Sequence, residues 1–403
     1  MTRQKTIQYN LEYAVMNGLN WMLFCVTFTF AGIFLLGRGY SSTELGLILA
    51  AGNLLALPLQ TLLADLADRS RRVTLLGLIV GMLAALLALA AACFLLPGKS
   101  PALTVAYTLS LAGTQGMQPL VNSFSFYLSG WGAPIQFGLC RAMGSVSYAA
   151  ASLLLAGAAE RLGVGAVPGA AGVLLALFLL VMLVFYVQRR GAAPAAAEVR
   201  AETGAGESVS LTAFFRKYPR YGLFLAGVAL IFVGHSFINN FTIQLVENVG
   251  GGTEEMGRLG AVMAVLELPG MLGFGLLLRK VRCSSVMKLS MALFTVKVTL
   301  TWLAGSIPAL YGATMFQVLT YALFIPGSVQ YAQEVIAPED AVKGQAFITS
   351  MLTLGTVASS LAGGRLTDLF GVSAAMLVFA AVSLVGSVLG IAGVEKTKRH
   401  GEG

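Results

Sequence analysis

Residues 73–97 read VTLLGLIVGMLAALLALAAACFLLP, a stretch without a single charged side chain. A helix of about 20 apolar residues crosses the hydrocarbon layer of a bilayer, which is roughly 30 Å thick. Within that layer a helix satisfies all of its own backbone hydrogen bonds, which an isolated extended segment cannot do. The stretch therefore predicts a membrane-spanning helix.

Similar stretches recur along the whole chain of 403 residues, which is 57% hydrophobic and only 11% charged. Average soluble proteins carry about 25% charged residues, so the composition predicts an all-α membrane protein embedded in a lipid bilayer. Twelve spans can be delimited, near 10–36, 43–65, 73–97, 102–129, 136–160, 166–188, 220–246, 254–279, 284–304, 307–333, 342–366 and 371–394.

The basic residues predict the orientation of these spans. If both termini are cytoplasmic, the inner loops and termini hold nineteen Lys and Arg, and the outer loops hold five. Basic residues concentrate on the cytoplasmic side of membrane proteins. We therefore expect a multi-pass protein of the inner (cytoplasmic) membrane with both termini inside. Because the basic residues lie in short loops, the net charge of +8 fits a membrane surface, and no nucleic-acid partner is expected.

One long polar stretch separates the sixth and seventh spans. Its core, GAAPAAAEVRAETGAGE, lacks apolar periodicity, which is typical of a flexible linker. We predict an N-terminal six-helix bundle at 1–189, a cytoplasmic linker at 190–218 and a C-terminal six-helix bundle at 219–403. The end of the linker mixes Phe with Arg and Lys, as a short interfacial segment does.

The two halves also resemble each other in sequence. AERLGV at 159–164 recurs as TDLFGV at 367–372, and the same offset of 208 residues places the first span on the seventh. Two parallel six-helix repeats are how many secondary carriers form a solute site near the middle of the membrane. The repeat therefore indicates two pseudo-symmetric bundles and a carrier.

The loop after the second span reads TLLADLADRSRR, and it sets Asp65 before a basic cluster of Arg69, Arg71 and Arg72. It resembles the signature loop of the major facilitator superfamily, although three positions of that pattern are replaced. The resemblance implies the major facilitator fold and a gating role for these four residues, because an acid can pair with a basic cluster and with helix dipoles. The alternative is a solvated, positive-inside loop.

Within that superfamily, FGLCRAMGSVSYAAA at 137–151 and MAVLELPGM at 263–271 resemble helices of the lactose permease type of oligosaccharide–proton symporter. The resemblance implies that Arg141 bonds sugar hydroxyls, that Tyr148 replaces a tryptophan stacked on the sugar, and that Glu267 is an acidic sugar ligand. Two departures stand out. Asn122 replaces the carboxylate partner of the arginine, and the tenth span lacks the permease's proton-coupling cluster.

The intramembrane charges point to the same residues independently. A charge at the bilayer centre costs about 2.5–3.5 kcal/mol even on insertion scales, so such a residue usually faces a cavity or a partner. Arg141, Glu267 and Lys297 lie deep in their spans. Glu267 is the candidate for proton coupling, with Lys297 and His235 beside it. The alternatives are a static Glu267–Lys297 salt bridge, a structural pair for Arg141, and a packing role for His235.

Uncharged polar residues complete the predicted solute site. An amide in a bilayer either binds solute or bonds another helix. We assign to the site Asn20, Asn122, Asn240 and Gln317.

Together these features predict a secondary active transporter, acting as a monomer, that imports a small polar solute such as a sugar or nucleoside by proton symport. The alternative is efflux of a drug or metabolite by proton antiport. No phosphate loop GxxxxGK[ST] occurs, so ATP hydrolysis is unsupported. We expect no metal, no cofactor beyond a proton gradient, and no enzymatic activity, and a non-transporting sensor remains an open alternative.

Overall fold

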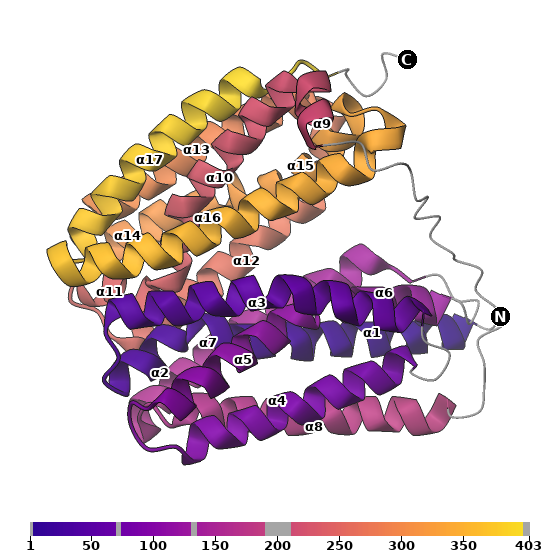
Figure 1. Cartoon of the computed structure of the whole chain (residues 1–403), viewed down its shortest axis with the longest axis vertical. Coiled ribbons are helices and arrows are strands. Elements are labelled where there is room, and N and C mark those ends of the chain that lie inside the picture. Colours follow the sequence, from indigo (N-terminus) through magenta and orange to yellow (C-terminus); the bar gives the residue numbers. More distant parts are fainter. Residues whose placement is uncertain (1–2, 70–73, 130–134, 190–210, 398–403) are drawn as a thin grey trace. The chain divides into compact units, whose positions relative to one another are not determined.

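The computed structural model of the chain describes residues 3–69, 74–129, 135–189 and 211–397, and in these ranges it contains helices and no strand. The chain forms two compact units, Met1–Ala201 and Glu202–Gly403 (Figure 1). The part of the predicted linker at 190–210 lies outside the described residues.

Helices of the first unit follow the predicted spans. In chain order they are α1 (Arg3–Phe24), the π-helical turn η1 (Cys25–Thr29), α2 (Ala31–Gly37), α3 (Ser42–Arg69), α4 (Leu75–Leu95), α5 (Pro101–Gly116), α6 (Gln118–Ser129), α7 (Phe137–Leu162) and α8 (Ala166–Arg189).

The second unit begins with a short helix and then repeats the pattern. Its elements are α9 (Leu211–Lys217), α10 (Pro219–Asn240), α11 (Thr242–Glu247), α12 (Thr253–Leu278), α13 (Cys283–Leu303), α14 (Ile307–Thr314), the 3₁₀ turn η2 (Met315–Val318), α15 (Tyr321–Val335), the 3₁₀ turn η3 (Pro338–Asp340), α16 (Ala341–Phe370) and α17 (Val372–Gly393).

Within the described ranges, eleven helical segments are long and apolar enough to cross a membrane. The remaining predicted span, near 102–129, is divided into α5 and α6 at Met117. Pro119 has no N–H to donate to the carbonyl of Gln115. That carbonyl accepts a hydrogen bond of 2.9 Å from the side-chain amide of Gln60 on α3 instead. The interruption is therefore stabilised by a neighbouring helix.

Helix α8 exposes a large apolar surface. Its most apolar window has a mean hydropathy of 2.8, yet only 17% of that window is buried inside the protein. A soluble protein rarely exposes an apolar surface of this extent. Lipid tails therefore cover this surface, and the chain is a multi-pass membrane protein.

The sequence repeat corresponds to a structural repeat. Helix α1 packs on α7 as α10 packs on α16, and α4 packs on α8 as α13 packs on α17 (Figure 1). Gly163 ends α7 with φ 77°, and Gly371 ends α16 with φ 83°. This left-handed conformation favours glycine, because a Cβ atom would be strained there. The predicted pseudo-symmetry of the two halves is confirmed.

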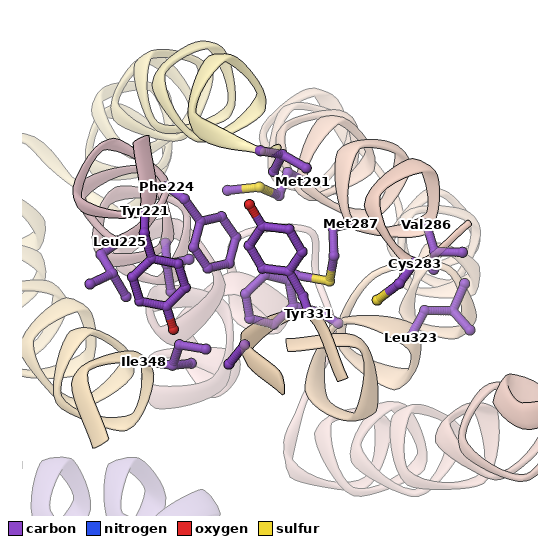
Figure 2. Packing of buried hydrophobic residues seen from close by; sticks show 14 of the residues in the cluster. Tyr221, Phe224, Leu225, Cys283, Val286, Met287, Met291, Leu323, Tyr331 and Ile348 are labelled. Carbon is purple, nitrogen blue, oxygen red and sulfur yellow. The ribbon is translucent and has the colours of Figure 1, made fainter. Parts of the chain in front are cut away.

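Aromatic rings and methionines form the core of the second unit near one end of its helices. Figure 2 shows the rings of Tyr221, Phe224 and Tyr331 grouped beside the sulfur atoms of Met287 and Met291. The two tyrosine hydroxyls still find partners: Tyr221 donates to the carbonyl of Gly344 at 2.8 Å, and Tyr331 accepts from the backbone N–H of Glu395 at 2.9 Å. Buried tyrosines normally need such partners.

Helix α9, at the end of the predicted linker, packs on this unit and is hydrogen-bonded to it. Phe214 is 1% exposed, and its ring centroid lies 4.9 Å from that of Phe347 on α16. Lys217 donates to the Asp340 carboxylate at 2.8 Å. This hydrogen bond raises the pKa of Lys217, because it favours the ammonium form.

Helices α10 and α17 touch through their backbones. A Cβ atom built on Gly227 would lie 2.4 Å from the Cα atom of Gly390 and 2.6 Å from the carbonyl oxygen of Gly386. Small residues allow this approach, and close van der Waals packing is a main source of helix association in lipid.

Gly227→Ala is expected to lower the thermal unfolding midpoint of the purified protein. The added methyl group meets backbone atoms that no rotamer change can move, and overpacking typically costs about 1–3 kcal/mol. Gly273→Ala on α12 is the control, because nothing lies within 4 Å of its added carbon. Equal midpoints for the two variants would contradict the backbone contact.

Candidate functional site

A chain of hydrogen bonds joins three predicted site residues in the second unit. Lys297 Nζ on α13 donates to Gln317 Oε1 at 2.5 Å, and Gln317 Nε2 donates to Glu267 Oε1 on α12 at 3.0 Å. A lysine only donates and an ionised carboxylate only accepts, so an amide with one oxygen and one NH₂ group can bridge them in just this order. The structure thus brings together Glu267, Gln317 and Lys297, which we call the charge chain.

Irregular helix geometry and a close helix approach place Gln317 and Glu267, the middle member and one end of the charge chain. Gln317 lies in the 3₁₀ turn η2, which interrupts the α-helical geometry of the tenth span between α14 and α15. Glu267 lies three residues before Gly270 on the same face of α12. A Cβ atom on Gly270 would lie 2.8 Å from the carbonyl oxygen of Val318, so α12 closely approaches η2 there. This approach sets Glu267 against Gln317.

Because Lys297 is buried, its charge needs the hydrogen-bond partner that the charge chain provides. Lys297 is 1% exposed and Gln317 is 2% exposed, whereas Glu267 is only partly buried. A buried ion that loses its hydrogen-bond partner retains a large desolvation cost. Gln317 therefore connects the ammonium group of Lys297 to the carboxylate of Glu267, which is more exposed than Lys297.

His235 on α10 lies in an aromatic enclosure next to the charge chain. Its ring stacks on Tyr321 with centroids 5.1 Å apart and meets the edges of Phe232 and Phe294. Nε2 lies 3.2 Å from the amide nitrogen of Asn239, and Nδ1 is buried without a hydrogen-bond partner among the described residues. These contacts fit the packing alternative as well as the coupling role.

The other predicted amides differ in their surroundings. Asn240 donates to Ser360 Oγ on α16 at 2.9 Å, which is a bond between helices. Asn20 on α1 is fully buried, and both of its amide atoms lack a hydrogen-bond partner among the described residues. Asn122 on α6 is exposed. Of these three, Asn20 has the buried, unsatisfied polar atoms that a ligand or water would pair with.

Arg141 and Tyr148 lie along the seam between α1 and α7 in the first unit. The guanidinium carbon of Arg141 lies 3.9 Å from the ring centroid of Trp21, which is a cation–π contact. Tyr148 Oη lies 2.5 Å from Thr29 Oγ1. The sequence prediction missed Trp21 and Thr29. A signal was present in the aromatic residues Trp21, Phe24 and Phe28, whose spacing of three and four places them on one helix face.

The predicted gating cluster is only partly described. Asp65 lies on α3 and is exposed, and α3 ends at Arg69. Arg71 and Arg72 lie outside the described residues. The gating role of the cluster stays a prediction.

Solved structures of transporters share this fold. A variant of the nucleoside transporter NupG matches with a TM-score of 0.82 at 15% identity, over 96% of this chain and 100% of that one. A bacterial homolog of the human lysosomal transporter Spinster matches with 0.74 at 13% identity, over 98% of each chain. An auto-inhibited peptide transporter of the POT family matches with 0.71 at 14% identity, over 96% of each chain. The fold is therefore that of a major facilitator transporter.

The family assignment follows from the sequence. The family model described as the MFS_1 like family matches residues 15–379. The chain belongs to this family of the major facilitator superfamily, as its sequence resemblance predicts. No curated protein sequence matches it closely enough to count as a relative.

Gln317→Leu is expected to destabilise the purified protein by about 1–3 kcal/mol, because Lys297 and Glu267 each lose a hydrogen-bond partner in a water-poor interior. The measurement is the thermal unfolding midpoint in detergent. Gln330→Leu is the matched control, since the Gln330 amide bonds only the exposed Glu334 in the described structure, at 2.8 Å. If Gln317→Leu unfolds no earlier than this control, the charge chain does not contribute to stability.

Proposed function

We propose that this protein imports a small polar solute, a sugar or a nucleoside-like molecule, by alternating access coupled to protons. The observation that carries the proposal is the charge chain: one carboxylate, Glu267, is bonded through Gln317 to a buried lysine. An intramembrane acid with a defined cationic partner is a common feature of proton relays and solute pathways.

The polarity of the charge chain supports coupling at Glu267. While Glu267 is ionised, its oxygen accepts from the Gln317 amide, which in turn accepts from Lys297. A protonated carboxyl oxygen becomes a donor, and the NH₂ group of Gln317 cannot accept from it. Protonation of the bonded oxygen therefore breaks or reorders the chain. A solute hydroxyl that donates to Glu267 competes for the same acceptor.

The preference for a hydroxylated solute has separate support. Arg141 carries five N–H donors in one plane, a geometry suited to paired oxygen acceptors. The fold neighbour NupG is a nucleoside transporter, and a nucleoside contains a sugar ring. We further propose that both termini are cytoplasmic and that the protein lies in the inner membrane, because the basic residues gather in the inner loops and termini. We also propose that the protein acts as a monomer.

A thermal-shift screen of the purified protein against sugars, nucleosides, polyols, dipeptides and cationic dyes is expected to give hits among the hydroxylated solutes. A ligand that binds only the folded state stabilises it by about 2.7 kcal/mol at a hundred times its Kd. If the hits are confined to cationic dyes and a deletion strain is sensitive to those dyes, the import proposal is wrong and efflux takes its place.

Glu267→Gln is expected to abolish accumulation of the identified solute in vesicles with a proton gradient and to spare counterflow, which needs no gradient. The glutamine keeps the size of the side chain but cannot ionise. Glu334→Gln is the matched control, because Glu334 is an exposed acid on α15. Accumulation by the Glu267→Gln variant at the level of this control would refute the coupling role.

A further inference from the structure

One buried face of α13 contacts the tenth span through two polar side chains. Ser290, Phe294 and Lys297 follow each other at spacings of four and three residues, so they share this face. Ser290 and Phe294 are fully buried, and Lys297 is 1% exposed. A lysine side chain leans toward the N-terminus of its helix, which for Lys297 is the direction of Ser290. The ammonium group and the hydroxyl therefore reach the same part of the tenth span.

The hydroxyl of Ser290 bonds the backbone just after the turn that carries Gln317. Ser290 Oγ donates to the carbonyl oxygen of Thr320 at 3.0 Å, and both residues are fully buried. Thr320 directly precedes α15, and its backbone angles of φ −98° and ψ −101° are not those of a helix. Because the chain leaves regular helix geometry here, a bond from the neighbouring helix gives the junction a fixed point.

Thr320 connects this fixed point to Gln317. Its backbone N–H and its side-chain hydroxyl both donate to the carbonyl oxygen of Phe316, at 2.9 and 2.8 Å, and Phe316 directly precedes Gln317. Helix α12 restricts the same turn, since a Cβ atom on Gly270 would lie 2.8 Å from the carbonyl oxygen of Val318. The turn η2 is therefore held by a hydrogen bond from α13 and by close contact with α12.

The bond from Ser290 is not required to satisfy the Thr320 carbonyl. The same oxygen accepts from the backbone N–H of Phe324 at 2.8 Å. Loss of the Ser290 hydroxyl thus leaves this buried acceptor paired, and an unpaired acceptor is what costs most in stability. The hydroxyl contributes chiefly to the position of η2.

We infer that Ser290 is a positioning residue for Gln317: its hydroxyl fixes η2 so that the amide joins Lys297 to Glu267. This inference deepens the proposed proton coupling at Glu267 and rests on it. It gives an uncharged residue of the ninth span a part in the hydrogen bonding of the carboxylate.

Infrared difference spectroscopy of the purified protein tests the positioning role. The carboxylate bands of a glutamate shift when a hydrogen-bond donor to it is lost, and subtracting the spectrum of the Glu267→Gln variant in each background isolates the Glu267 bands. In Ser290→Ala these bands are expected to shift toward their position in Gln317→Leu, while the thermal unfolding midpoint falls less than in Gln317→Leu. Ser290→Cys, which nearly keeps the side-chain size and is a weak donor, is expected to shift the bands in the same direction.

Ser387→Ala on α17 is the matched control. Ser387 is also a buried serine bonded to the backbone of a neighbouring helix, because its hydroxyl donates to the carbonyl oxygen of Met291 on α13 at 2.6 Å. Met291 directly follows Ser290, so the control removes a bond of the same kind beside the tested one. Unshifted Glu267 bands in both Ser290 variants, or an equal shift in Ser387→Ala, would overturn the inference.

Transport assays separate the inference from the proposed function. Ser290→Ala is expected to lose accumulation of the identified solute relative to Ser387→Ala and to keep counterflow. Accumulation at the level of Ser387→Ala would overturn the part of Ser290 in coupling. If Glu267→Gln still concentrates solute, the proposed coupling fails, whereas the infrared bands, recorded without solute or gradient, still decide whether Ser290 positions Gln317.

Discussion

The cost of placing a charge in hydrocarbon is the constraint on which the functional interpretation depends. Lys297 is almost completely buried in a helix of a membrane protein, and such an ion needs a partner that replaces water. Gln317 provides that partner and passes the interaction to Glu267. Stability of the second unit and the protonation state of Glu267 are therefore linked through one amide. The proposed proton coupling at Glu267 depends on this link.

In both units, breaks in helices and close helix contacts position the polar side chains. Where backbone hydrogen bonding or close packing must change, the chain uses proline, glycine or a short turn, as at Pro119, Gly144, Gly270 and η2. In lipid, a broken helix persists when neighbouring side chains satisfy the freed backbone groups. The Gln60 amide does so for the Gln115 carbonyl. Irregular backbone thus occurs beside polar side chains of the candidate site.

Much of the fold could be predicted from the sequence, because hydropathy is a local signal that the bilayer makes strong. The repeat of AERLGV in TDLFGV correctly located two equivalent helix ends. The interruption at Met117 was missed, although residues 113–119 read GTQGMQP, in which Gly116 and Pro119 favour a break in a helix. Members of the site could be named as intramembrane polar residues, yet their partners could not. The bridging position of Gln317 and the cation–π contact of Arg141 with Trp21 depend on contacts between different helices.

The proton linkage of solute binding shows whether Glu267 takes up or releases a proton when the solute binds. Calorimetric titrations of one solute, in buffers that differ in ionisation enthalpy, give the number of protons taken up or released on binding. We expect a non-zero proton count for the unsubstituted protein and a count near zero for the Glu267→Gln variant. The same count for both proteins, or no linkage in the unsubstituted one, would contradict a coupling role for the carboxylate that Gln317 joins to Lys297.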